Sequence, residues 1–164
     1  MFSRLCRCDL RREMFTGIYE HTIDKKGRTS MPARFRNELG GEAYLSVGID
    51  KNLVIYSTAH FKAMADEIGS LSLADPTARI YRRRMFNKAE CIEIDASGRF
   101  VIPPFLREEL SEEVLDKVVF AGSNDYIEIW TVQGWQQAEA EAFHDDAMTE
   151  NFAKLMNRQW RNND

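Results

Sequence analysis

The 164-residue chain has few of the residues that build most metal and disulfide sites. It contains three cysteines and three histidines, and beyond Cys6 and Cys8 no second Cys/His pair has the spacing of metal ligands. A disulfide framework and a zinc site are therefore not expected. No apolar stretch approaches the ~18 residues of a membrane helix, and the first residues lack the apolar core of a secretory signal. We expect a cytoplasmic protein with no metal, no cofactor and no membrane association.

The sequence also lacks the usual catalytic patterns. We find no Gly-rich phosphate loop and no Ser/His/Asp set, and the scattered histidines leave no good general base. Asp24 and Asp95 could imitate an aspartic-protease pair, in which two carboxylates share one proton. However, neither is followed by Thr/Ser-Gly, and each has an arginine four residues on that would keep it ionised. We expect no catalytic residue, no enzyme activity and no small-molecule substrate.

The net charge of −4 does not by itself favour nucleic-acid binding, but the distribution of charge is uneven. Residues 1–88 hold 16 Lys and Arg against 10 Asp and Glu, whereas residues 89–164 hold 6 against 16. Such asymmetry is more informative than the total. A local positive field can attract DNA even when the whole chain is acidic.

What the sequence does contain is one pattern written twice. Asp24 and Asp95 each open an Asp-x-x-Gly-Arg segment, and the two segments lie 71 residues apart. At the same offset, both copies continue with a proline, an arginine and a leucine: Pro32, Arg36 and Leu39, then Pro103, Arg107 and Leu110. This self-similarity indicates an internal duplication, and two copies favour a pseudo-dimer within one chain over a solenoid.

Apolar spacing predicts the elements. Strands are expected near 18–24, 28–31, 43–47 and 53–56, with a helical turn at 33–39. Ser57 and Asp75 are candidate N-caps of two helices, the second with Pro76 at its first position and an end near residue 87. The second copy repeats this order, and a last helix is expected at 146–161. The predicted class is α+β, mainly β, with a first repeat at 14–88, a second at 89–164, and a leader at 1–13 that is disordered or a start-site artefact.

The Asp-x-x-Gly-Arg turns are the best candidate sites. The aspartate can accept backbone N–H groups of the loop, and glycine allows a conformation that other residues avoid. The arginine then presents a planar fork that suits a phosphate or the O6 and N7 atoms of guanine. Lys25 and Lys26 add phosphate attraction to the first turn. For Arg28 we favour this role over structural pairing with an aspartate across the pseudo-twofold axis. For Arg99 both interpretations stay open, because Ala96 and Ser97 replace the lysines.

Two further features have structural interpretations. Arg82, Arg83 and Arg84 spread around the predicted helix, which favours a solvated face with salt bridges over direct DNA contact. For the whole basic run from Arg79 to Lys88, the expected partners are acidic residues of the same or another subunit, such as Glu108, Glu109, Glu112 and Glu113. Cys91 lies in a predicted strand and is interpreted as a buried, small apolar residue.

From Met14 to about Trp160 the chain resembles the MraZ family, whose members carry two SpoVT/AbrB-type repeats. The resemblance is carried by residues 19–28, by Asp75-Pro76, by Ala89-Glu90 and by residues 95–99 with Pro103. It implies a pseudo-twofold β-barrel with flanking helices and subunits that assemble into a ring. It also implies a transcription regulator of the division and cell-wall gene cluster, usually a repressor of its own operon, that binds short, G-rich direct repeats.

Combined with the motifs, the resemblance implies a nucleoid-associated homo-oligomer that binds double-stranded DNA at its own operon promoter. The expected DNA-binding residues are Lys25, Lys26, Arg28 and Arg99, and the expected turn-shaping residues are Asp24, Gly27, Asp95 and Gly98. A second class stays open: a barrel scaffold that acts on protein partners, as antitoxins of the AbrB type do through an appended tail. The amphipathic pattern at 146–161 favours an ordered helix over such a tail.

Overall fold

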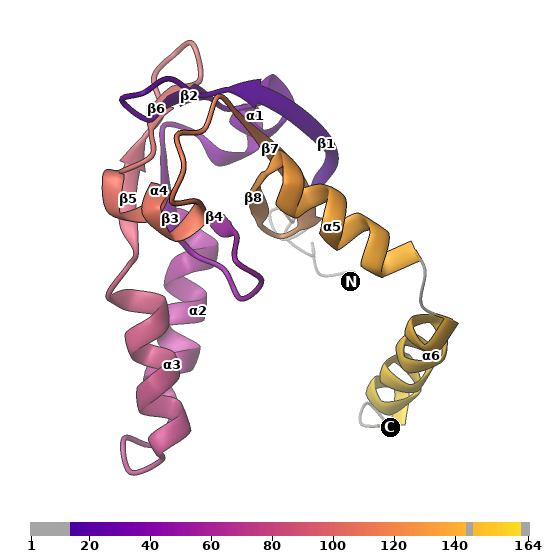
Figure 1. Cartoon of the computed structure of the whole chain (residues 1–164). Coiled ribbons are helices and arrows are strands. Elements are labelled where there is room, and N and C mark those ends of the chain that lie inside the picture. The colour runs from indigo at the N-terminus through magenta and orange to yellow at the C-terminus, as the bar shows by residue number, and fades with distance from the viewer. Residues whose placement is uncertain (1–13, 144–145, 162–164) are drawn as a thin grey trace, which may run out of the picture. The chain divides into compact units, whose positions relative to one another are not determined.

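The computed structural model describes residues 14–143 and 146–161, so the leader predicted at 1–13 lies outside the described part. The chain divides into two compact units, one ending at Val132 and one beginning at Gln133. The first unit contains the strands and four helices of the described residues, and the second contains helices alone (Figure 1). The α+β class is therefore confirmed, but the prediction that the chain is mainly β is wrong, because helices hold more of the described residues than strands do.

The main sheet has six strands in the order β1-β7-β8-β4-β3-β5, and every neighbouring pair is antiparallel. Strands β1, β3 and β4 of the first repeat correspond to β5, β7 and β8 of the second. Exchanging each strand for its equivalent gives the same order in reverse, so the sheet has the twofold symmetry expected from the duplication. The strands are β1 (Phe15–Thr22), β3 (Glu42–Val47), β4 (Leu53–Ser57), β5 (Glu90–Glu93), β7 (Lys117–Asn124) and β8 (Ile127–Thr131).

A second, two-stranded sheet joins the repeats again. It pairs β2 (Arg28–Ser30) with β6 (Arg99–Val101), so that Arg28 lies opposite Val101 and Ser30 opposite Arg99. The closed barrel expected from the resemblance is not confirmed. Within the described residues β1 and β5 are the edge strands of the large sheet. They end at Thr22 and Glu93, just before the two Asp-x-x-Gly-Arg turns.

The core lies against the inner face of the large sheet. Phe15, Leu45, Ile55 and Phe120 from the strands are fully buried. The short helices α1 (Ala33–Leu39) and α4 (Pro104–Leu110) each add a fully buried side chain, Phe35 and Leu106. Burying each such side chain stabilises the fold by about 1.5–3 kcal/mol. The two helices that follow the turns are thus anchored firmly in the core.

Helices α2 (Thr58–Ser70) and α3 (Pro76–Phe86) lie side by side and extend from the sheet (Figure 1). Both predicted N-caps are confirmed. Ser57 Oγ accepts the backbone N–H of His60 at 3.2 Å, and Asp75 Oδ1 accepts that of Thr77 at 2.8 Å. These bonds satisfy donors that the first turn of a helix leaves free.

The interpretation of Cys91 as a buried residue is wrong, because its side chain is exposed. Side chains alternate along β5, and Ile92 and Ile94 occupy the core side, so Cys91 faces outward from an edge strand. Partial loss of solvent raises the pKa of its thiol, and the carboxylates of Glu42, Glu90 and Glu93 raise it further. The thiolate, the reactive form, is therefore disfavoured.

The salt bridges predicted for the basic run from Arg79 to Lys88 are confirmed at Lys88, which pairs with Glu109. Within the described part of the chain, Arg82 and Arg84 bond backbone carbonyls instead. Arg82 Nη2 donates to the carbonyls of Gly69 and Leu71, at 2.7 and 2.8 Å. Arg84 Nη2 donates to the carbonyl of Gly48 at 2.8 Å. The two arginines therefore tie α3 to the end of α2 and to the turn after β3.

The second unit holds most of α5 (Val132–Phe143) and all of α6 (Asp146–Arg161). The bounds of α6 agree with the helix predicted at 146–161. On α6 the side chains of Phe152, Leu155 and Met156 are 63%, 60% and 40% exposed. Their spacing of three and four residues places them on one face of the helix. No helix formed by the described residues combines the length and apolarity needed to cross a bilayer.

Candidate functional site

The first Asp-x-x-Gly-Arg turn is shaped by its own aspartate. Asp24 Oδ1 accepts the backbone N–H groups of Lys26 and Arg28, both at 2.9 Å. The N–H of Gly27 donates to the carbonyl of Asp24, also at 2.9 Å. Gly27 has φ +81°, a value that L side chains rarely adopt. The turn therefore has a defined shape and exposes Lys25 and Lys26 at its tip.

Arg28 is oriented by an ion pair inside the same turn. Its Nε donates to Asp24 Oδ2 at 2.6 Å, and its side chain is nevertheless 63% exposed. The backbone bond from Arg28 holds the pKa of Asp24 below its ordinary value, and the guanidinium lowers it further. Pairing across the pseudo-twofold axis is thus absent from this turn. The ion pair uses Nε, and in the described part of the chain neither Nη group of Arg28 makes a bond.

The second turn repeats this geometry without the lysines. Asp95 Oδ1 accepts the N–H groups of Ser97 and Arg99 at 2.8 and 2.9 Å, and Gly98 has φ +84°. Arg99 Nε donates to Asp95 Oδ2 at 2.9 Å, within the turn and not across the axis. The backbone bond from Arg99 again lowers the pKa of the carboxyl, and the guanidinium adds to it. The tip carries Ala96 and Ser97, so this turn has less positive charge.

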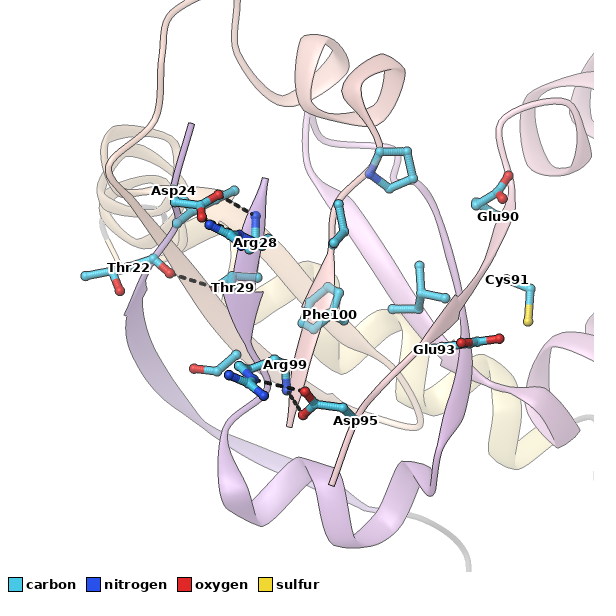
Figure 2. A pocket seen from close by; sticks show the side chains of 15 residues that line it. Thr22, Asp24, Arg28, Thr29, Glu90, Cys91, Glu93, Asp95, Arg99 and Phe100 are labelled. Carbon is cyan, nitrogen blue, oxygen red and sulfur yellow. Dashed lines mark hydrogen bonds and ion pairs between the residues drawn. The ribbon is translucent and has the colours of Figure 1, made fainter. Parts of the chain in front are cut away.

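The short ribbon of β2 and β6 sets the distance between the turns. Because the strands are antiparallel and Arg28 and Arg99 each begin one, the two ion pairs lie at opposite ends of the ribbon (Figure 2). The same view shows Thr29 bonded to the carbonyl of Thr22, at 2.8 Å, which fastens the ribbon to the end of β1. One chain therefore presents two differently charged turns on one rigid support.

A hollow of about 1270 Å³ lies beside the ribbon and is lined by both ion pairs (Figure 2). Glu90 and Glu93 of β5 also line it, so its wall carries four carboxylates against two guanidinium groups. That balance disfavours a phosphate inside the hollow. Lys25 and Lys26 do not line it, and the surface best suited to an anion is therefore the tip of the first turn.

Sequence reasoning missed the role of the repeated arginines that follow each turn. Arg107 Nη1 donates to the carbonyl of Lys25 at 3.0 Å, and Arg36 Nη1 donates to that of Ala96 at 3.3 Å. Each arginine thus reaches the turn of the other repeat. The equal spacing of Arg36 from Asp24 and of Arg107 from Asp95 could have indicated a shared role. Which turn each arginine contacts depends on how the two repeats pack together.

The chain matches known proteins over both repeats. The family described as "MraZ protein, putative antitoxin-like" matches residues 14–84 and again residues 85–159. A Thermomicrobium roseum protein is 38% identical over 144 residues, which cover 87% of this chain and all of the relative. A Herpetosiphon aurantiacus protein is 39% identical over 82% of this chain and 92% of its own length. A Finegoldia magna protein is 40% identical over 76% and 85%. All three are named transcriptional regulator MraZ.

Proposed function

The chain belongs to the MraZ family, and we propose that it is a transcription regulator that binds double-stranded DNA at the promoter of its own operon. The proposed target is the division and cell-wall gene cluster, which it represses through short, G-rich direct repeats. The protein then acts in the cytoplasm, associated with the nucleoid, and not as an enzyme. Its relatives' names support the regulatory role, and the rest of the proposal is argued from the first turn.

The exposed, oriented guanidinium of Arg28 is the observation that carries the proposal. Asp24 holds Nε, which leaves the two Nη groups as a fork that makes no bond in the described part of the chain. Such a fork matches the O6 and N7 acceptors of guanine in the major groove. Lys25 and Lys26 at the same tip supply phosphate contacts, which position a protein on DNA but do not read its sequence. One turn therefore offers both affinity and selectivity.

Arg99 has the same geometry with less charge around it. Ala96 and Ser97 give the second turn no phosphate-binding side chain of its own. We therefore assign Arg99 an accessory DNA contact and the first turn the main reading role. Asp24, Gly27, Asp95 and Gly98 serve to shape the two turns.

In the proposed ring, several subunits contact one DNA molecule, so each single turn needs to bind only weakly. Several copies of the first turn on a ring, facing direct repeats in DNA, bind tightly through high effective concentration. The exposed apolar face of α6, formed by Phe152, Leu155 and Met156, supports contact between subunits. The proposed active form is thus a homo-oligomeric ring.

Fluorescence anisotropy tests this proposal. The full chain is titrated onto duplex DNA from upstream of its operon and onto a scrambled duplex, over a series of salt concentrations. We expect tighter binding to the upstream DNA and a steep fall of affinity with salt. The double variant Lys25→Ala/Lys26→Ala should lower the slope of log K against log salt by about 1–2, since each lost phosphate contact removes about 0.9. Equal weak binding of the wild type to both duplexes would refute DNA reading.

A protein-binding role is the second candidate, favoured by the antitoxin-like description of the family and by the same apolar face of α6. In that case the barrel-type repeats act as a scaffold and α6 binds a different protein. The candidate predicts that Phe152→Asp abolishes partner capture and leaves DNA affinity per turn unchanged. If the same variant weakens binding to tandem repeats of DNA, α6 serves the ring.

A further inference from the structure

Each Asp-x-x-Gly-Arg turn is hydrogen-bonded by an arginine of the other repeat. We propose that Arg107, from the second repeat, is the positioning residue of the first turn and so sets the direction of Lys25 and Arg28, an inference that rests on the proposed function. Arg107 lies 82 residues from the carbonyl that it binds. The DNA-binding turn of the first repeat is therefore not self-sufficient.

The contacts place Arg107 directly behind the turn. Its Nη1 donates to the carbonyl of Lys25 at 3.0 Å. A Cβ added at Gly27 would lie 2.7 Å from Arg107 Nε and 3.0 Å from its Cδ, so the stem of the arginine fills the space under the glycine. Arg107 Nε is enclosed and has no bonding partner in the described part of the chain. The side chain is therefore held here by its Nη1 bond to Lys25 and by packing under Gly27, and not by Nε.

The support for Arg107 is rigid. It lies on α4, whose residues Leu106 and Leu110 are buried in the core. Just before α4, the N–H of Ile102 donates to the carbonyl of Gly27 at 2.8 Å. The backbone of the turn is therefore held at two successive points, Lys25 and Gly27, by one segment of the second repeat. A contacting group held by packed elements keeps its aim better than one on a free loop.

The bonds to the carbonyls of Lys25 and Gly27 fix the groups of the turn that are proposed to contact DNA. The carbonyl of Lys25 belongs to the peptide that leads to Lys26, so fixing it restricts both lysines at the tip. The same turn positions the N–H of Arg28 on Asp24, and with it the base of the guanidinium fork. Losing Arg107 should therefore reduce selectivity and affinity together, although Arg107 itself does not reach the DNA.

Arg36 provides a matched control inside the same chain. It occupies the equivalent position on α1 and is half-buried like Arg107. It holds the second turn through the carbonyl of Ala96, at 3.3 Å, and lies 3.2 Å from a Cβ placed on Gly98. Removing either arginine costs one similar bond, but only Arg107 serves the turn that carries the lysines.

The experiment compares Arg107→Met with Arg36→Met in the full chain. Methionine keeps much of the stem and removes every donor. We expect amide exchange at Gly27 and Arg28 to accelerate in Arg107→Met, while Gly98 and Arg99 keep wild-type rates; Arg36→Met should show the converse. On upstream duplex DNA the Kd of Arg107→Met should rise by up to about tenfold, because DNA must then order a turn that the bond no longer holds, and the salt slope should be unchanged. Arg36→Met should change that Kd less than about threefold.

Three results would overturn the assignment. Unchanged exchange at Gly27 in Arg107→Met would show that the arginine does not hold the turn, whatever happens to DNA binding. A salt slope lowered by about 0.9 would show that Arg107 contacts a phosphate itself. Failure of Arg107→Lys, a second variant that retains the charge and a donor, to recover any protection at Gly27 would show that a donated hydrogen bond is not what holds the turn. If the wild type does not select its upstream DNA, the proposed function fails, and amide exchange still decides whether Arg107 holds the turn.

Discussion

Replacing Gly27 by alanine should cost clearly more stability than replacing Gly98, although the two glycines have nearly the same backbone conformation. Their φ angles are +81° and +84°, so the intrinsic penalty for an L side chain, about 1–2 kcal/mol, is common to both. What differs is the space that the new Cβ meets. At Gly27 it would lie 2.5 Å from the backbone carbonyl oxygen of Ile102. At Gly98 its nearest neighbours, the side chain of Arg36 and the carbonyl of Met31, are 3.2 Å away.

The overlap at Gly27 involves backbone that is hydrogen-bonded to the turn, so it cannot move away cheaply. Overpacking of this kind adds about 1–3 kcal/mol. We therefore expect Gly98→Ala to lower the free energy of unfolding by about 1–2 kcal/mol, and Gly27→Ala by about 2–5 kcal/mol. Urea unfolding of both variants at one fixed protomer concentration measures the difference, since the proposed assembly would make stability depend on concentration. Equal losses, or a larger loss for Gly98→Ala, would refute the close contact between the first turn and the second repeat.

Three further outcomes are expected. In an NMR titration of the side-chain carboxyl of Asp24, the midpoint should lie below the ordinary value of about 4, so the stability that this group adds is complete above that pH and is lost as pH falls through the lowered pKa; a midpoint at or above the ordinary value would contradict the bonded turn. Ser57→Ala should lower the urea-derived free energy of unfolding by about 1 kcal/mol, because α2 loses its cap at the N–H of His60; an unchanged value would mean that this cap contributes nothing. Phe152→Asp should reduce the mass found by light scattering while far-UV circular dichroism is unchanged, since it places a charge on the apolar face of α6; an unchanged mass would remove that face from the subunit contact.

Local structure was largely predictable from the sequence because its causes are local. The caps at Ser57 and Asp75 and the helix at Ala33–Leu39 depend on residues within one turn of each other. The bonds inside each Asp-x-x-Gly-Arg segment are likewise local, from those of the carboxylate to the positive φ of glycine. Such features need no knowledge of distant partners.

Features that depend on how the repeats interlock could not be predicted. The pairing of β1 with β7 joins Phe15 to Asn124, which no local pattern announces. The exposed face of Cys91 follows from the edge position of β5, and an inward and an outward strand residue look alike in sequence. The partner of Arg107 is known only once α4 has been placed beside the first turn. The contacts between the two repeats, such as that of Arg107 with the first turn, therefore could not be predicted from the motifs alone.

The most direct test of DNA reading by the first turn is the selectivity of Arg28→Ala beside that of Arg99→Ala. Both variants remove a guanidinium paired with its own aspartate, so their structural costs are matched. The quantity measured is the ratio of Kd values for scrambled and upstream duplexes, at one salt concentration. We predict that Arg28→Ala brings this ratio close to one, whereas Arg99→Ala retains most of the wild-type ratio. If Arg28→Ala instead weakens binding to both duplexes equally and preserves the ratio, Arg28 reads no base and the central claim is contradicted.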